Sequence, residues 1–334
     1  MINLDPIVLW RKKGWIATLA ACALFSAATC VAQPAWKPER TVEIVVGSAP
    51  GGGNDKTARV LLKIWQENKW LENATVANRV GGGGAVAYTY TNQTAGDGHR
   101  IAVARTGLLT NHIRGLSPLN YTDMTPIAMV ADDPMALTVR ADSAIKSVGD
   151  LTTRWKADPQ ALAISLGSSV GSTTHFLVAL IAKSAGVDPA RLKVLNPGGS
   201  SKSVTQLLGG HIDMVSLAAG NTVAHHKAGT VRLIGVASEK RLLSVPEVPT
   251  IREQGVDVVQ GGWTLIVGAG GLTAAQVAYW ENLLERTVNH PEWKKSIESD
   301  SAVWLFMKSQ PARDFLKKDY EMDRALLLEL GMVK

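Results

Sequence analysis

The residues that could do chemistry in this sequence stand in three loops rich in glycine and hydroxyl side chains, at 48–55, 81–84 and 167–174. The first loop follows an apolar run at 42–46, whose β-branched side chains predict a buried strand. A helix is expected after the loop, with Asn54 or Asp55 as its cap. Because the N–H groups at a helix start lack intrahelical partners, this loop is predicted to seat a carboxylate or a phosphate.

Nucleotide motifs fail in this first loop. A phosphate-binding P-loop needs glycine directly before Lys-Ser/Thr, but Asp55 stands there before Lys56 and would repel phosphate. A dinucleotide fingerprint that starts at Gly51 needs glycine at the position of Lys56. No cofactor is therefore predicted.

The third loop offers an alternative, because GSSVG at 167–171 matches the G-x-S-x-G pattern of a nucleophile elbow. Ser169 would be the nucleophile of a secreted serine hydrolase. The possible acids and bases are Asp213, Asp257, His225, His226 and His290. A true elbow starts its helix directly after the serine, whereas Gly171 to Thr173 still reads as loop and cap. The hydrolase therefore remains the second hypothesis, and no catalytic residue is predicted.

Histidines and acidic residues do not form a convincing metal site. His225 and His226 are adjacent, and neighbouring helical residues diverge by about 100°, so this pair is expected at a solvated helix end. His175, in the first helical turn after the third loop, is expected to cap or order that loop, with a ligand contact as the alternative. No paired acidic cluster suggests glycosidase or metal chemistry, and no metal is predicted.

The first 32 residues are typical of a secretory signal peptide. Three basic residues at 11–13 precede an apolar run from Trp15 to Ala28, and small residues follow at 30–32. An uncleaved membrane anchor is the alternative, although the run is shorter than the ~20 residues of a membrane span. Both cysteines lie in this segment, so disulfides and thiolate chemistry are not expected in the mature chain. The remaining charge is mildly basic and scattered, which argues against nucleic acid as a partner.

Strand and helix signals alternate along the rest of the chain, which is typical of α/β architecture with a parallel sheet. Strands are expected at 42–46, 74–77, 101–104, 127–130, 135–139, 162–166, 192–195, 212–217 and 233–237. The segment from Ala274 onward is expected to be mostly helical. Many strands end in Gly, Ser, Thr or Asn, and ligands of open α/β sheets bind beyond the carboxyl ends of strands.

Together these motifs resemble the solute-binding receptors of tripartite tricarboxylate transporters, the Bug family. VGSAPGGGND at 46–55 is similar to the family's V-x-F-A-P-G-G-x-x-D, and NRVGGGG at 78–84 to its N-R-P-G-A-G-G. GSSVGSTTHF at 167–176 resembles G-S-x-G-x-G-S-x-x-H-L with one glycine missing. Weaker matches in family order are DGHRI at 97–101, LLGGHID at 207–213, KAGTVR at 227–232 and PEVPT at 246–250.

The resemblance implies a type II periplasmic-binding-protein fold with two lobes, each a mostly parallel sheet flanked by helices, and two crossover segments at the hinge. Residues 36–139 with 250–334 would form lobe one, and residues 140–249 lobe two. It also implies a periplasmic location, a small organic carboxylate as ligand and membrane permease subunits as partners; we expect a monomer. A sensory ligand-binding subunit of the same fold is a further alternative.

The ligand-binding residues implied by the resemblance come from both lobes. They are Ser48, Ala49, Gly51, Gly52, Gly53, Asn54, Gly82, Gly83 and Gly84 in lobe one, and Ser168, Ser169, Ser172, Thr173 and Asn221 in lobe two. Two positions depart from the family, with Ser48 in place of an aromatic residue and Asn196-Pro197 in place of Pro-Tyr. Both departures predict a more polar cleft with smaller walls, and hence a ligand that differs from the usual dicarboxylates.

Overall fold

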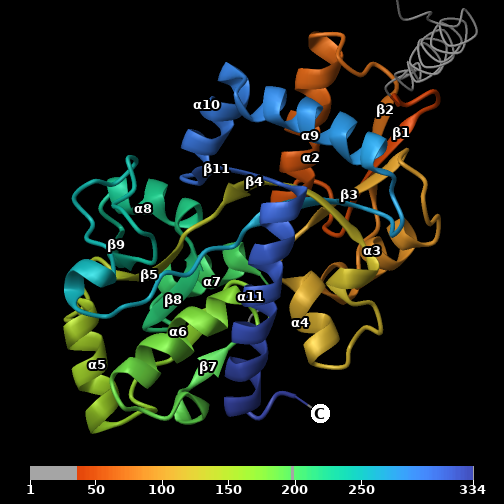
Figure 1. Cartoon of the computed structure of the whole chain (residues 1–334). Helices are drawn as coiled ribbons and strands as arrows, with labels where there is room; N and C mark the ends of the chain where they lie inside the picture. The colour runs from red at the N-terminus through yellow and green to blue at the C-terminus, as the bar shows by residue number, and fades with distance from the viewer. Residues whose placement is uncertain (1–35, 197–198, 334) are drawn as a thin grey trace, which may run out of the picture. The chain divides into compact units, whose positions relative to one another are not determined.

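Two β-sheets flanked by helices make up the computed structural model, which describes residues 36–196 and 199–333 (Figure 1). The strand order is β11-β4-β10-β3-β1-β2 in the first sheet and β7-β6-β8-β5-β9 in the second. The predicted signal peptide, residues 1–32, and Pro197 lie outside the described residues. The α/β class with two sheets, predicted from the sequence, is confirmed.

The first sheet combines strands from both ends of the chain. Its strands are β1 (Val42–Val46), β2 (Ala74–Asn78), β3 (Arg100–Ala104), β4 (Thr125–Asp132), β10 (Thr264–Gly268) and β11 (Val303–Lys308). Strands β2, β1 and β3 run parallel, so their carboxyl ends meet at one edge. Their side chains form a buried centre, in which Ile44, Val45 and Ile101 are inaccessible to solvent.

The second sheet is built from the middle of the chain. Its strands are β5 (Met135–Arg140), β6 (Ile164–Leu166), β7 (Val194–Leu195), β8 (Met214–Ala218) and β9 (Val231–Val236). Strands β7, β6 and β8 run parallel, whereas β5 pairs antiparallel with β8 and β9. The predicted lobe boundary after Val139 falls inside β5, a strand of this second sheet.

Ten α-helices stand among the described residues and cover the sheets. They are α2 (Gly53–Glu67), α3 (Ala85–Asn92), α4 (Gly107–Ile113), α5 (Val148–Ala157), α6 (Thr173–Ser184), α7 (Ser200–Leu208), α8 (Val223–Lys227), α9 (Ala274–Val288), α10 (Pro291–Ser299) and α11 (Ser309–Glu329). Short 3-10 turns are η1 (Gly82–Gly84), η2 (Tyr121–Asp123), η3 (Pro189–Arg191), η4 (Ala219–Asn221) and η5 (Arg252–Gln254). None of the helices at 36–196 and 199–333 has both the length and the apolar character needed to cross a membrane.

Both sheets are mixed rather than mostly parallel, and the reason lies in the crossovers between them. The chain leaves the first sheet through β4 and returns through β10, which lies beside β4. The chain re-enters the first sheet at the end where it left, so β10 pairs antiparallel with β4 and with β3. Neither β10 nor the edge strand β11 was predicted from the sequence.

The two crossovers are hydrogen-bonded to each other. The first, Asp133-Pro134, joins β4 to β5, and the second runs through Gln260 to Trp263 into β10. The N–H of Met135 donates to the carbonyl of Gln260 at 3.0 Å, and the N–H of Gly262 to that of Asp133 at 2.9 Å. These paired segments form the backbone connection between the sheets.

Helix α11 adds a side-chain connection between the two sheets. It packs beside α4, and its Leu326 and Leu327 share one apolar cluster with Phe176 and Ala179 of α6 (Figure 1). Each buried Leu or Phe side chain contributes about 1.5–3 kcal/mol of stability relative to an exposed one. The helix therefore ties the first sheet to the second outside the crossovers.

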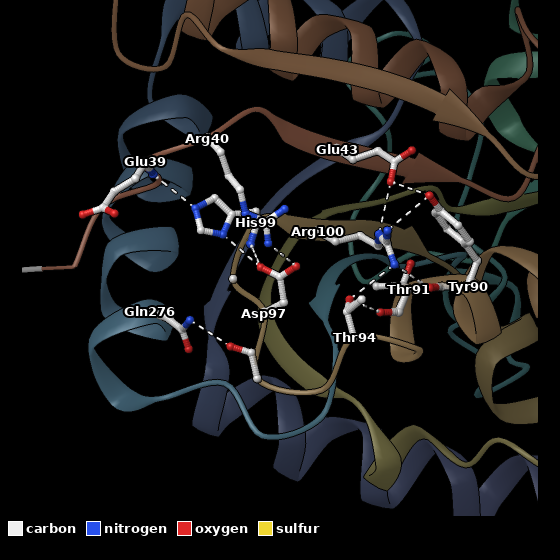
Figure 2. A network of polar contacts seen from close by, with 12 residues as sticks. Glu39, Arg40, Glu43, Tyr90, Thr91, Thr94, Asp97, His99, Arg100 and Gln276 are labelled. Carbon is white, nitrogen blue, oxygen red and sulfur yellow. Dashed lines mark hydrogen bonds and ion pairs between the residues drawn. The ribbon is translucent and has the colours of Figure 1, made fainter.

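The amino ends of β1 and β3 are closed by a network of charged and polar side chains (Figure 2). Arg100 donates to Glu43 at 3.1 Å, and its guanidinium lies 4.1 Å from the ring centre of Tyr90. Asp97 pairs with Arg40 at 2.7 Å and with the ring of His99 at 2.9 Å. At this end of the sheet the charges are paired with one another.

Candidate functional site

The first loop, at the carboxyl end of β1, leads directly into α2 without a side-chain cap. Gly52 is the N-cap residue of α2, and no side chain hydrogen-bonds to the helix start there. The prediction that Asn54 or Asp55 caps the helix is therefore wrong, because both residues lie inside its first turn. The reason is that the glycines let the backbone enter the helix two residues earlier than the cap pattern suggests.

Asp55 instead holds the loop in shape. Its carboxylate accepts hydrogen bonds from the N–H of Gly51 at 2.8 Å, from Nδ2 of Asn78 at 2.9 Å and from Nε of Arg59 at 2.7 Å. The Arg59 guanidinium is the main reason why the pKa of Asp55 falls to about 2. The negative charge of Asp55 is thus balanced by Arg59 one turn further along the helix.

Backbone and hydroxyl donors remain at the start of α2. Within the described part of the chain, no hydrogen bond is donated by the N–H of Gly53 or Asn54. The Oγ of Ser48 is buried and has no hydrogen-bond partner there either. Buried polar atoms are normally paired, so the Ser48 hydroxyl is the unusual one, and the N–H groups of Gly53 and Asn54 beside it can also donate to a bound acceptor.

The second loop is packed rather than open. All four glycines from Gly81 to Gly84 have positive φ, and a Cβ on Gly84 would lie 2.7 Å from the ring of Tyr88. A Cβ on Gly107 would lie 2.3 Å from the carbonyl oxygen of Gly83. Asn111 Nδ2 donates to the carbonyl of Gly82 at 2.7 Å. Glycine is favoured at all four positions by the positive φ, and at Gly84 a side chain would also clash with Tyr88.

The third loop carries a cluster of three hydroxyls at the start of α6. Ser168 Oγ lies 2.6 Å from Ser172 Oγ and 3.2 Å from Thr174 Oγ1, and the last two are 3.0 Å apart. The N–H of Gly171 donates to Nδ1 of His175 at 3.1 Å, which confirms that His175 orders the loop. Burial, with Arg114 nearby, lowers the pKa of His175 to about 4, so the ring is neutral at pH 7.

Loops from the two sheets contact each other at two places. Thr173 Oγ1 at the start of α6 donates to Thr106 Oγ1 after β3 at 3.0 Å. A Cβ on Gly220 would lie 2.1 Å from the carbonyl oxygen of Asp300, so η4 touches the turn after α10. The predicted residue Asn221 is exposed, and its side chain donates to the carbonyl of Ala218 at 3.0 Å. Ser169 is also exposed.

Arg105 is a candidate that the sequence analysis missed. It follows β3, and its Nε donates to Oδ1 of Asn54 at 2.9 Å. Its Nη1 donates to the carbonyl of Gly262 at 2.7 Å and pairs with the carboxylate of Asp133. A cation directly after a strand parallel to β1 was the available signal, since the carboxyl ends of parallel strands share one edge.

The arrangement of the candidate acids and bases does not support the hydrolase hypothesis. Asp213 accepts from the N–H of Ala163 at 2.7 Å, Asp257 from Arg252 at 2.6 Å, and His226 contacts Glu247 at 3.0 Å. His290 accepts from the N–H of Glu292 at the start of α10. No hydrogen bond between described residues joins any of these groups, or His225, to Ser169. Within the same residues, no group of three or more His, Cys, Asp or Glu is placed to hold a metal.

Comparison with known proteins gives consistent findings. The model of the tripartite tricarboxylate transporter family receptor matches residues 65–332. Protein BugT of Bordetella pertussis is 27% identical over 94% of this chain and 97% of its own length. A TctC solute-binding protein from Polaromonas, solved without ligand, has a TM-score of 0.75 at 24% identity, covering 88% of this chain and 100% of that one. An R. palustris protein solved with adipate has a TM-score of 0.77 at 22% identity, with coverages of 89% and 99%.

Proposed function

This chain belongs to the tripartite tricarboxylate transporter family of receptors, and from that membership we propose that it is a periplasmic receptor for a small organic carboxylate. It captures the ligand between two lobes and presents it to the membrane permease subunits of a transporter. The similar fold of an adipate-bound protein supports this ligand class. The observation that carries the proposal is the uncapped start of α2 beside the unpartnered hydroxyl of Ser48.

The proposed site binds one carboxylate group at the start of α2. The N–H groups of Gly53 and Asn54 and the hydroxyl of Ser48 donate to its oxygens, and the helix dipole favours the negative charge. Hydrogen bonds to a charged group contribute about 1.5–3 kcal/mol each, roughly twice those to a neutral group. The carboxylate of Asp55 is not expected to contact the ligand, because its oxygens already accept hydrogen bonds from Gly51, Asn78 and Arg59.

The other proposed residues complete the site from two sides. The second glycine loop provides a wall without side chains, and the hydroxyls of the third loop approach from the second sheet. The proposed set is Ser48, Ala49, Gly51 to Asn54, Gly82 to Gly84, Ser168, Ser169, Ser172, Thr173 and Asn221. The bond between Thr173 and Thr106 supports their placement, because it brings the third loop next to the strand ends of the first sheet.

In this proposal each lobe corresponds to one sheet with its helices. The crossovers at Asp133-Pro134 and at Gln260 to Trp263 then act as the hinge, since rotation between two packed units is absorbed by a few residues that connect them. This places the first boundary before β5, whereas the sequence analysis set it after Val139.

Ligand-dependent stabilisation tests the function. The protein is heated with a panel of mono-, di- and tricarboxylates, and at one hundred times the dissociation constant a true ligand adds about 2.7 kcal/mol to the free energy of unfolding. Stabilisation by at least one carboxylate is expected. A panel without any stabilising carboxylate, together with ester turnover that Ser169→Ala abolishes, would favour the hydrolase instead.

Two variants of Gly53 locate the site. A Cβ at Gly53 meets no atom within 4 Å, so the fold tolerates a side chain there. Gly53→Glu places a negative charge at the helix start, which stabilises α2 by about 0.3–1 kcal/mol and repels the ligand. Calorimetric titration should show at least about a tenfold loss of affinity relative to the neutral, equally large Gly53→Gln. Equal affinities of the two variants would contradict a carboxylate at this position.

A further inference from the structure

Arg105 hydrogen-bonds to the first loop and to both crossovers. Its Nε donates to the side chain of Asn54 in the first turn of α2. Its Nη1 reaches the carboxylate of Asp133 on the first crossover and the carbonyl of Gly262 on the second. These contacts are far apart in sequence, so only the folded chain brings them to one guanidinium.

The two residues that bond to Nη1 of Arg105 are also hydrogen-bonded to each other. The N–H of Gly262 donates to the carbonyl of Asp133 at 2.9 Å, and Pro134 forms a bridge with Gly261. A Cβ on Gly261 would lie 2.0 Å from the carboxylate of Asp132, so the second crossover lies close against the first. Any rotation between the sheets has to change backbone angles in these segments. Arg105 therefore bonds to the segments about which the two sheets would rotate.

Partial burial strengthens the interaction of Arg105 with the crossovers. Its side chain is only 23% exposed and that of Asp133 is 24% exposed, so solvent screens the pair less than it screens a surface pair. Burial, together with the neighbouring Asp133, raises the pKa of Asp132 to about 6. Burial also raises the pKa of Asp300, although the nearby positive charges of Lys56 and Arg105 partly oppose this rise. Arg105 is thus a fixed positive charge among partly buried carboxyl groups.

We propose that Arg105 is a positioning residue that couples occupation of the first loop to closure of the lobes. The inference rests on the proposed function, in which the N–H of Asn54 binds the ligand. A ligand that fixes the main chain of Asn54 also fixes its side-chain oxygen, which orients the guanidinium. The oriented guanidinium then holds Asp133 and Gly262 together and so favours one angle between the sheets. The bidentate fork of arginine suits this role, because several donors lie in one rigid plane.

Closure is measured by the distance between two spin labels. The described residues contain no cysteine, so labels are attached at cysteines introduced for the exposed residues Glu72 beside the first sheet and Lys156 on α5 beside the second. Distances are recorded for the mature protein with and without the carboxylate that stabilises it best. In the parent protein the ligand is expected to narrow the distance distribution to a single short distance.

Arg105→Gln and Arg105→Lys separate closure from binding. Both variants are expected to bind about tenfold more weakly, because the bound ligand no longer gains the stability of the closed form. Even at saturating ligand they should keep the broad distribution of the free protein. Arg105→Lys retains the positive charge, so it tests the fork itself and covers the case in which Arg105→Gln does not fold. The matched control is Arg252→Gln, which removes a surface arginine that also bonds two carboxylates and should close normally.

Asn54→Ala adds a check on the route of coupling. If Arg105 acts through Asn54, the double variant Asn54→Ala with Arg105→Gln loses less affinity than the product of the two single losses. Arginine variants that saturate and close like the parent protein would overturn the coupling while leaving the proposed function intact. A parent protein that binds no carboxylate would overturn both proposals.

Discussion

The two ends of the first sheet differ in whether their polar groups have hydrogen-bond partners. At the amino ends of β1 and β3, Arg100, Glu43 and Tyr90 bond one another, and Arg40 pairs with Asp97 (Figure 2). At the carboxyl ends, glycine loops leave main-chain donors and the hydroxyl of Ser48 without a partner in the described residues. Paired side chains stabilise a fold, whereas unpaired preorganised donors can bind a ligand, so this contrast supports the site proposed at the carboxyl end.

Glycines at the carboxyl end serve two purposes. Gly53 has open space around the position of a Cβ, and Gly51 does too, so these residues expose the backbone. Gly84 and Gly107 lie against Tyr88 and the carbonyl of Gly83, so these residues allow close packing. Glycine is therefore replaceable at position 53, whereas a side chain does not fit at positions 84 and 107.

The largest effect is expected from Gly84→Ala. Its φ is 100° and a Cβ would meet the Tyr88 ring at 2.7 Å, so backbone strain and overpacking add up. We expect a loss of about 3 kcal/mol in the free energy of unfolding, measured by urea denaturation. Gly53→Ala is the control and should change this free energy by less than about 1 kcal/mol. Equal losses in both variants would remove the distinction between the packed and the exposed glycines.

A smaller effect on stability is expected at the opposite end from Arg100→Met. The variant keeps much of the side-chain volume but leaves Glu43 without its arginine and removes the contact with Tyr90. The expected loss is about 2 kcal/mol, because both partners are partly buried. Ligand affinity should stay within about twofold, since ends this far apart act independently. A large loss of affinity in calorimetry would show that the amino end contributes to binding.

Asp55→Asn tests the carboxyl end with the smallest expected loss of stability, about 1–2 kcal/mol, because the amide oxygen still accepts one hydrogen bond. The pKa of Asp55 is lowered from 3.8 to about 2 in the folded protein. Its contribution is therefore fully present above pH 4 and is lost as the pH falls toward 2. Acid denaturation curves of the two proteins should converge in that range. Curves that stay parallel down to pH 2 would mean that Asp55 does not hold the loop.

Local sequence patterns were enough for most of the elements. The β-branched run at 42–46 and the apolar run at 101–104 became β1 and β3, because short apolar strands next to glycine are a local signal. Strand β10 was missed although all five of its residues are buried. Strand β11 was missed because its residues are half exposed and do not alternate. Both strands owe their pairing to β4, more than one hundred residues earlier in the chain.

The sequence by itself determined where bare backbone is available, because glycine content and strand ends are local properties of the chain. Only the tertiary structure decided what each polar group does there. Asp55 was expected as a cap and instead holds the loop through Gly51 and Asn78. The place of Arg105 directly after β3 hinted at the site, but its partners Asn54, Asp133 and Gly262 lie 51, 28 and 157 residues away and have no local signal. The direction of a long side chain is set by distant partners in the fold, and local propensity carries no information about them.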